Sequence, residues 1–330
     1  MAWKCVVGAQ GEPCVQQNST RKGFCTVKLI NYCGIEGGNF GDDINLQLWD
    51  RLFPNLAELT DKVLFYGVGT LLDGRHDQSV RKVVLGSGSG EYGAALPDNN
   101  WDFRWVRGPL TAAEFSLPAQ SAIGDAAILW PELTPGHEAN GPVGLIPHYA
   151  TWDSFDWVGV AKQAGMKVIN PRQSPNEVIS QMRGCSRILA ESLHGAICAD
   201  AMSIPWAACI LAHRFNEFKW RDWLATIDRP YAPLIIDRPL VRRIAPAKAF
   251  ANKVARLINY KRRTRYPALR PVAASTPSDV RAVSQSLRQY GRCSAQFACS
   301  EPQTIARQRL LMRQRCADFA TDYRLQFDPA

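Results

Sequence analysis

Short apolar runs alternate along residues 25–236 with longer segments whose apolar positions recur at helical spacing. Such short runs between polar or glycine-rich turns are typical of strands buried in a parallel sheet, and the intervening segments are typical of connecting helices. The pattern predicts strands at residues 26–32, 62–68, 82–85, 102–106, 143–147, 167–170, 187–190 and 206–211. This alternation predicts an α/β fold.

The helices expected between these strands carry recognisable end signals. Ser174, Pro175 and Glu177 combine a capping box with proline in the first turn, so they predict the start of a helix. Pro205 ends the helix that precedes the strand at residues 206–211. The predicted helices cover residues 43–52, 110–115, 154–163, the segment after 174, 196–203 and 216–227.

A Pro/Gly-rich stretch, PELTPGHEANGP at residues 131–142, divides the alternation into two halves. This composition is typical of a linker. We expect an irregular segment at residues 1–24, Rossmann-like domains at residues 25–135 and 136–260, and a basic linker with C-terminal helices at residues 261–330. A cleft between two domains is the expected place for a ligand.

Past residue 236 the alternation weakens and the charge becomes strongly positive. We expect a basic helix at residues 241–260, a linker at residues 267–277 and helices at residues 278–288 and 304–318. The net charge is +9, and from Arg242 onward there are 18 Lys and Arg but only 5 Asp and Glu. This asymmetry predicts contact with an anionic surface, either membrane headgroups or nucleic acid.

Several classes of protein are disfavoured. No run of about 18 apolar residues occurs, so we expect no transmembrane helix. The N-terminal residues have the pattern of neither a signal peptide nor a transit peptide. The ten cysteines include no C-x-x-C pair and no zinc spacing, which favours reduced thiols in a cytoplasmic protein. No P-loop, metalloprotease, nucleophile-elbow or EF-hand motif occurs.

Polar residues interrupt the apolar stretch RILAESLHGAICADAMSIPWAA at residues 187–208. Glu191, Ser192 and His194 follow a predicted strand and precede a helix. Ligands of parallel α/β sheets bind at the carboxyl ends of strands, and the N-terminus of the next helix suits an anion. We therefore expect His194 at the mouth of an anion site. The alternative is a histidine buried beside a tight turn.

Acidic residues occupy the equivalent place in the first half. Asn39, Gly41, Asp42 and Asp43 lie in the stretch NFGDDIN, after the first predicted strand of the alternation. Glycine lets a backbone approach a ligand closely, and one aspartate can cap the helix while the other faces the cleft. The stretch is a candidate ligand site, with simple helix capping as the alternative.

A second glycine-rich loop follows a later strand of the first half. GSGEYG at residues 88–93 matches the dinucleotide fingerprint formally, but no helix is predicted after it, which argues against a nicotinamide enzyme. We expect the backbone amides around Gly86, Ser87 and Gly88 to line the cleft.

Three further basic or protonatable side chains lie at the ends of predicted strands: Arg107, His148 and Arg172. Arginine binds carboxylate or phosphate through two parallel hydrogen bonds. Together with His194 they predict a site for a compound that carries a phosphate, a carboxylate or both. For Arg107 an ordinary surface position is the alternative.

The stretches NFGDDIN, VRGPLTA, GDAAIL, LIPHY and SLHGAICADAMSIP occur in this order. In order and spacing they resemble the polysaccharide pyruvyl transferases, the enzymes that place pyruvate ketals on bacterial exopolysaccharides such as succinoglycan and xanthan. The resemblance covers about residues 25–211. It implies two Rossmann-like domains arranged as in the GT-B glycosyltransferases, with the acceptor on the first domain and the donor on the second.

The resemblance also implies the substrates. Phosphoenolpyruvate would be the co-substrate, with no other cofactor and no metal. The acceptor would be two hydroxyls of one hexose in a lipid-linked or polymeric saccharide. The histidine of the family's L-H-G motif contacts the donor and maps onto His194, with Leu193 beside it. Many members have arginine where this chain has Ser192, so Arg172 or Arg107 would have to supply that charge.

Ketal formation requires a general acid, a base and cations for the donor. Protonation of the methylene carbon of phosphoenolpyruvate leaves a cation at C2. One sugar hydroxyl attacks this cation, phosphate leaves, and the second hydroxyl closes the ketal. We expect His194 as the acid or a phosphate ligand, His148 as a ligand of the carboxylate or phosphate, and Asp42 or Asp43 as the acceptor-side base.

Two other functions fit the same sequence. A nucleotide-sugar glycosyltransferase of the GT-B class would take a uridine nucleotide in place of phosphoenolpyruvate. A nucleic-acid-binding protein would use the basic C-terminal quarter, but aromatic residues are not interleaved with its arginines, so we expect no nucleic acid. We expect instead that this quarter docks the protein peripherally on the anionic inner face of the cell membrane.

Overall fold

The computed structural model describes residues 3–6, 14–18, 27–31, 38–59, 63–72, 79–90, 99–130, 132–152, 155–211, 216–236 and 276–329. The basic helix predicted at residues 241–260 and most of the linker predicted at residues 267–277 lie outside this set.

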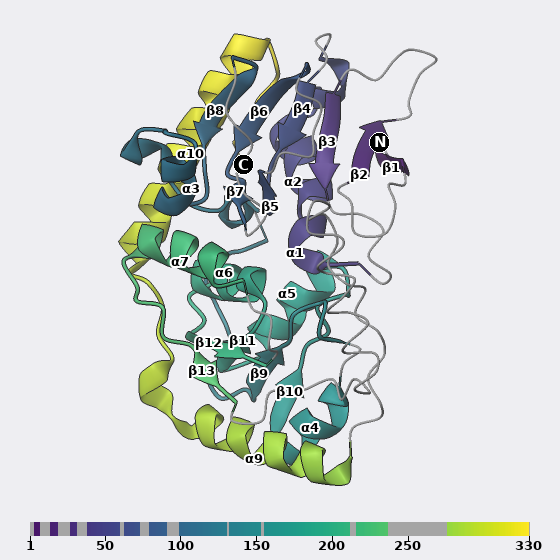
Figure 1. Ribbon diagram of the computed structural model, residues 1–330, viewed down its shortest axis with the longest axis vertical. Helices are drawn as coiled ribbons and strands as arrows, with labels where there is room; N and C mark the ends of the chain where they lie inside the picture. Colours follow the sequence, from purple (N-terminus) through teal and green to yellow (C-terminus); the bar gives the residue numbers. More distant parts are fainter. Residues whose placement is uncertain are drawn as a thin grey trace, which may run out of the picture.

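The first sheet has the strand order β1-β2-β3-β4-β6-β8 (Figure 1). Its parallel strands are β3 (Val27–Asn31), β4 (Val63–Tyr66), β6 (Arg81–Leu85) and β8 (Trp101–Trp105). Two antiparallel strands, β1 (Trp3–Val6) and β2 (Cys14–Asn18), extend its edge. The expectation of an irregular segment at residues 1–24 is therefore wrong. Strand β1 forms by pairing with β2, and β2 by pairing with β3, and no apolar run marks either of them in the sequence.

The second sheet is parallel throughout, with the order β10-β9-β11-β12-β13. Its strands are β9 (Val143–Ile146), β10 (Met166–Val168), β11 (Arg187–Ala190), β12 (Trp206–Ile210) and β13 (Leu234–Ile235). A small parallel pair, β5 (Thr70–Leu72) with β7 (Gly88–Ser89), accompanies the first sheet. The predicted α/β class with parallel sheets is confirmed.

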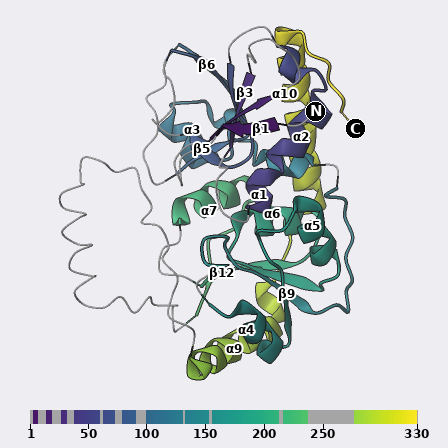
Figure 2. The same cartoon turned by 90° about the vertical axis from the view of Figure 1, so that its right-hand side faces the viewer.

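Helices connect the strands and also fill the space between the two sheets. The helices are α1 (Phe40–Asp43), α2 (Asn45–Leu52), α3 (Pro109–Glu114), α4 (Trp157–Ala164), α5 (Pro175–Arg183), α6 (Leu193–Ala201), α7 (Glu217–Leu224), α9 (Pro277–Arg292) and α10 (Pro302–Tyr323). Both views place α1, α6 and α7 between the sheets (Figures 1 and 2). The capping box predicted at Ser174 and Glu177 is present at the start of α5.

Helix α6 begins three residues earlier than the sequence predicts. The Ser192 hydroxyl accepts a hydrogen bond from the N–H of Gly195 at 3.3 Å, which caps the helix and draws Leu193, His194 and Gly195 into its first turn. Glycine weakens a helix in isolation, so the pattern placed the start after it. Here Gly195 packs closely on the second sheet, because an added Cβ would lie 3.3 Å from Cδ1 of Ile146.

The described part of the predicted linker, residues 132–142, is irregular, as expected, but it packs against the second half. The N–H of Glu138 donates to the carbonyl of Arg183 at 2.8 Å, and the N–H of Gly136 donates to the carbonyl of Met202 at 3.0 Å. Leu133 is buried in the core.

The two C-terminal helices join the cores of both halves (Figure 1). Helix α9 packs on α4 and buries Val283 and Leu287 in the cluster under the second sheet. It begins at Pro277, with the Thr276 side chain as its cap, so the predicted linker ends before these residues. Helix α10 returns to the first sheet, where Phe319 packs against Phe53 at a centroid distance of 5.2 Å. One cluster of buried side chains runs continuously from the first sheet into the second.

Candidate functional site

The candidate site lies where α1 of the first half meets α6 of the second. Strand β11 ends at Ala190, and the chain turns there into α6, so His194 projects toward the first sheet. Helix α1 approaches from the other side, and the N–H of Phe40 donates to the carbonyl of Pro171 at 3.0 Å. The residues that the sequence singled out at two separate strand ends therefore meet between the sheets.

Gly41 is the point of closest approach between the halves in this region. A Cβ atom at residue 41 would overlap Nδ1, Cγ and Cβ of His194. Only the backbone of α1 fits against the imidazole, which explains glycine at this position. The sequence predicted a close approach of a ligand to Gly41; in the structure the histidine of α6 lies against it, and contact with a ligand stays a prediction.

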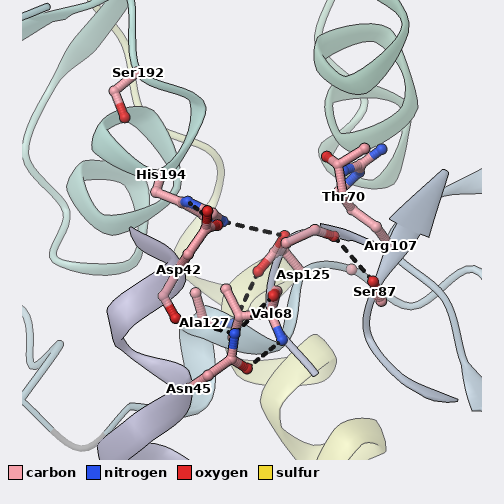
Figure 3. Close-up of polar contacts among 12 residues, drawn as sticks. Asp42, Asn45, Val68, Thr70, Ser87, Arg107, Asp125, Ala127, Ser192 and His194 are labelled. Carbon is pink, nitrogen blue, oxygen red and sulfur yellow. Dashed lines mark hydrogen bonds and ion pairs between the residues drawn. The ribbon is translucent and has the colours of Figure 1, made fainter. Parts of the chain in front are cut away.

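Two carboxylates flank the imidazole of His194 (Figure 3). Nδ1 lies 3.8 Å from Oδ1 of Asp42, and Nε2 lies 3.8 Å from Oδ2 of Asp125. Both separations are ion-pair distances and exceed a normal hydrogen bond. Among the described residues, neither Nε2 of His194 nor Oδ2 of Asp125 has a hydrogen-bond partner, and both atoms are buried. This is an arrangement able to hold and transfer a proton.

The acidic turn of α1 is organised by Asn39. Its side-chain amide donates to Oδ2 of Asp42 at 2.7 Å, and its backbone N–H donates to Oδ2 of Asp43 at 3.1 Å. Burial raises the pKa of Asp42, against the opposing effect of His194. Burial also raises the pKa of Asp43 to about 6. Both carboxyl groups therefore bind protons more readily than an aspartate in water.

In the second half, Glu191 connects the loop after β11 to the loop after β9 by hydrogen bonds. Its Oε2 accepts from the N–H of His148 at 2.8 Å and from the hydroxyl of Thr151 at 2.6 Å. This fixes the loop after β9 against the loop after β11, and burial raises the pKa of Glu191. The pKa of His148 is lowered well below its usual value by burial and by the positive charges of Lys219 and His194. His148 is therefore neutral at pH 7.

Lys219 of α7 is a cation that the sequence reasoning did not single out. Its charge lowers the pKa values of Asp42 and Glu191 and that of His148, so its ammonium group acts on residues from both halves. Little in the sequence indicates a role for Lys219 in the site. It lies between the aromatic residues of a predicted amphipathic helix, where a lysine is expected to face solvent.

Arg107 is committed to a buried ion pair. Its Nε donates to Oδ2 of Asp222 in α7 at 3.1 Å, with the two side chains 1% and 0% exposed. Its Nη1 donates to Thr70, and its Nη2 donates to the carbonyl of Ser89. Asp222 also accepts from the N–H and hydroxyl of Thr111 at 3.0 and 2.6 Å, which caps α3. The alternative of a surface arginine is wrong, since this pair joins the two halves in the interior.

The glycine loop of residues 86–89 packs around this arginine. A Cβ at Gly88 would overlap the Arg107 guanidinium, and one at Gly86, where φ is +93°, would lie 2.6 Å from Cβ of Ala126. The N–H groups of Gly86 and Gly88 donate to the carbonyls of Trp105 and Gly69, and the hydroxyl of Ser87 donates to Gly69 as well. The expectation that the amides of Gly86 and Gly88 line the cleft therefore does not fit, because protein carbonyls accept hydrogen bonds from both.

The remaining predicted residues support the structure around the site through capping, packing and hydrogen bonds to the backbone. Ser192 caps α6, and Leu193 is buried in the core cluster. Arg172 is half-buried, and its Nε and Nη2 donate to the carbonyl of Tyr149, the residue after His148, at 3.3 and 3.1 Å. The structure thus brings Asp42, Asp43, His148, Arg172 and His194 to one region and sets Arg107 and Leu193 into the packing around it.

Asp125 was overlooked although it lies in the stretch GDAAIL. Its Oδ1 accepts from the N–H of Ala127 at 3.0 Å and caps the short helix η3 (Ala126–Leu129). From the sequence alone, an aspartate before a turn is interpreted as a helix cap. Nothing in the sequence relates it to a histidine 69 positions further on. Within the described ranges, no group of three or more His, Cys, Asp or Glu side chains is arranged to hold a metal ion.

Comparison with known proteins gives a family and one relative. The family model described as polysaccharide pyruvyl transferase matches residues 32–212. The succinoglycan biosynthesis protein ExoV of Rhizobium meliloti (strain 1021) is 39% identical over 210 residues, which are 61% of this chain and 66% of that protein. The chain thus spans just under two thirds of the length of this curated relative. No solved structure matches the chain. No helix in the described ranges has both the length and the apolarity of a membrane span.

Proposed function

Because the chain belongs to the polysaccharide pyruvyl transferase family, we propose that it transfers pyruvate from phosphoenolpyruvate to two hydroxyls of a hexose in exopolysaccharide synthesis, forming a pyruvate ketal. The observation that carries the proposal is the imidazole of His194 between the carboxylates of Asp42 and Asp125, in the positive field of Lys219. This places proton-transferring groups and a cation together between two α/β halves, as in the GT-B arrangement that we propose for them.

The donor requires positive charge and a proton. Phosphoenolpyruvate carries a carboxylate and a phosphate, and its methylene carbon must be protonated before a hydroxyl can attack C2. His194 is the proposed acid, since it lies at the N-terminus of α6, where partial positive charge favours an anion. Lys219 is the proposed cation that replaces the arginine missing at Ser192, since its charge acts on Asp42 and His148. Arg172, which holds the carbonyl of Tyr149 next to His148 in the chain, is a second candidate.

The acceptor hydroxyls require a base. Asp43 is only half-buried and has a pKa of about 6, so it is ionised at pH 7 and protonates readily. We assign it, with Asp42, to the acceptor side. His148 is neutral because burial and the neighbouring positive charges lower its pKa, so it serves as a hydrogen-bonding ligand of the donor and not as a second cation. The scheme uses no cofactor and no metal.

Calorimetric titration with phosphoenolpyruvate, and with UDP as the rival ligand, tests the proposal. The wild-type protein should bind phosphoenolpyruvate saturably, and His194→Ala should lose this binding while remaining folded. Lys219→Met should weaken it by about 10- to 100-fold, the value of one hydrogen bond to a charged group. The matched control is Lys162→Met, which removes an exposed lysine of α4. Binding of UDP without phosphoenolpyruvate would contradict the proposal in favour of a nucleotide-sugar glycosyltransferase.

We also propose that the protein contacts the cytoplasmic face of an anionic membrane, where a lipid-linked acceptor would be presented. The outer face of α10 supports this. Leu310 is 68% exposed and Leu311 37% exposed, and they lie among Arg307, Arg313 and Arg315. Exposed leucines among arginines suit the boundary between headgroups and acyl chains.

Vesicle sedimentation tests this contact. The protein should sediment with vesicles that contain phosphatidylglycerol, less so with pure phosphatidylcholine, and less so at high salt. Leu310→Glu should reduce binding, whereas Val158→Glu, a change at a similarly exposed residue of α4, should not. Equal binding of the two variants would contradict a role for α10.

A further inference from the structure

The two nitrogens of His194 lie in different surroundings. Nε2 is buried and faces Oδ2 of Asp125, whose side chain is fully buried. Nδ1 faces Asp42, whose side chain keeps 10% exposure, and the imidazole as a whole keeps 11%. The Asp125 side of the ring is therefore closed by protein, whereas on the Nδ1 side, beside the backbone of Gly41, the carboxylate of Asp42 keeps some exposure.

Asp125 is held in this orientation by the backbone around it. Its Oδ1 is occupied by the N–H of Ala127, which leaves Oδ2 directed toward the imidazole (Figure 3). Ala126 in turn packs on Gly86, where a Cβ would lie 2.6 Å from Cβ of Ala126 and 2.8 Å from its nitrogen. The hydrogen bond to Ala127 and the packing of Ala126 on Gly86 therefore set the position of the Asp125 carboxylate independently of any ligand.

A buried carboxylate that faces one nitrogen of an imidazole determines where the proton of the neutral ring resides. The nitrogen beside the carboxylate keeps the proton, and the other nitrogen is left to exchange one. The separation of Nε2 and Oδ2 is 3.8 Å, and catalytic hydrogen bonds often tighten only when the substrate is bound.

We propose that Asp125 is a positioning residue that keeps a proton on Nε2 of His194, so that Nδ1 is the nitrogen that delivers the proton to the donor. The assignment rests on the proposed function for its chemistry. In the step, the Nδ1–H bond breaks, the π electrons of phosphoenolpyruvate form the new C–H bond at the methylene carbon, and the cation forms at C2. His194 is left neutral with its proton on Nε2.

The charged and titratable groups around the ring fit this direction of transfer. Asp42 on α1 faces Nδ1, and burial raises its pKa, so it is able to pass an acceptor proton to Nδ1 for the next step. The charge of Lys219 on α7 acts on Asp42 and on His148 at the end of β9. Asp125 is the carboxylate on the buried side.

The tautomer of His194 can be measured directly, without turnover. In a ¹⁵N-histidine-labelled protein, long-range ¹H–¹⁵N correlation spectra above the titration of the ring distinguish the Nε2–H from the Nδ1–H form, and His194→Ala identifies the signal. We expect the Nε2–H form in the wild type and a shift toward Nδ1–H in Asp125→Asn. The matched control is Asp156→Asn, which alters another aspartate whose Oδ1 caps a helix. A wild-type His194 in the Nδ1–H form would overturn the proposal even if the Asp125 variant failed to fold.

The pH dependence of turnover is a second test of the role of Asp125. A general acid must be protonated, so the rate falls as pH rises through the pKa of the acid. The carboxylate of Asp125 faces the proposed acid at 3.8 Å, so in Asp125→Asn the falling limb of the pH–rate profile should move. We expect kcat to fall by at least about tenfold, as is typical of general acid catalysis, with a smaller change in KM for phosphoenolpyruvate. A loss in KM alone, with an unmoved pH limb, would overturn the positioning role.

The two proposals fail separately. A protein that shows the Asp125-dependent Nε2–H form but neither binds nor turns over phosphoenolpyruvate would overturn the proposed function and support the positioning of His194. A protein that turns over phosphoenolpyruvate with a pH profile and tautomer unaffected by Asp125→Asn would do the reverse.

Discussion

The guanidinium of Arg107 lies fully buried against the carboxylate of Asp222, with Nε 3.1 Å from Oδ2, and this pair connects the strand end of β8 in the first half to α7 in the second. Gly108 makes the approach possible, because a Cβ there would overlap the backbone of Asp222. The arrangement of the two halves, and with it the site, therefore depends on an ion pair that takes no part in the proposed chemistry.

Arg107→Met should destabilise the protein by about 3–5 kcal/mol, because it leaves the buried charge of Asp222 without its cationic partner. Adding Asp222→Asn should restore part of this loss, since the second change removes the unpaired charge. Urea denaturation measures both. The control, Arg221→Met, removes an exposed ion pair with Glu217 and should cost less than about 1 kcal/mol. A raised KM for phosphoenolpyruvate with unchanged stability would instead assign Arg107 to the donor.

Gly41→Ala should displace His194, because the new methyl group would occupy the position of the imidazole. We expect turnover of phosphoenolpyruvate to fall by about 100-fold or more, as an error of about 1 Å in position can cause, with a stability cost of about 1–3 kcal/mol from overpacking. Gly184→Ala is the control, since its Cβ would be 3.6 Å from the nearest atom. Equal activity of the two variants would show that His194 is not held by this contact.

Asp43→Asn should stabilise the protein at pH 8 relative to the wild type and have little effect at pH 4. Folding raises the pKa of Asp43 from 3.8 to about 6, so the folded state favours the protonated form, and the wild type loses stability as pH rises through this range. Asparagine carries no charge and avoids that loss. Urea midpoints at pH 4, 6 and 8 measure the difference.

A constant difference between Asp43→Asn and the wild type across the three pH values would contradict the raised pKa. The activity gives an independent check. If Asp43 is the acceptor-side base, the wild-type rate rises as pH increases through about 6, and this rise is absent in the variant.

Phe319→Ala should cost about 3–5 kcal/mol, the usual value for a large buried aromatic residue. Phe319 is fully buried and packs edge-on against Phe53 and tilted against Phe65. Thermal or urea unfolding measures the loss, and Leu310→Ala on the exposed face of the same helix should change stability by less than about 0.5 kcal/mol. A small effect of Phe319→Ala would mean that α10 is not part of the first half's core.

Much of the fold was predictable because it depends on local pattern. Strand β11 has the predicted bounds, and the capping box of α5 is formed by the predicted residues. The helix predicted at residues 216–227 is α7 followed by a short 3-10 turn, η5 (Ala225–Ile227). The strands β1 and β2 were missed because the pairing of β1 with β2 and of β2 with β3, and not their own composition, makes them strands.

The site was predictable only in part, for a related reason. His194, Asp42 and Asp43 each follow a predicted strand in the sequence, and that position, together with the family resemblance of the stretches that contain them, marked them. Asp125 gave no sign of its partner, because only the docking of η3 beside α6 brings its Oδ2 to 3.8 Å from His194. Arg107 lies at a strand end, where a ligand-binding residue is expected, but it forms an ion pair with Asp222 of the other half.

The sequence by itself determined the α/β alternation, the caps and the basic C-terminal quarter, since these follow from periodicity, local hydrogen bonding and charge, which act over a few residues. Only the tertiary structure decided which polar groups share the space between the sheets. That choice depends on burial, which pairs Arg107 with Asp222 and places His194 between Asp42 and Asp125. Burial depends on how the whole chain packs, so it cannot be predicted from any short segment of the sequence.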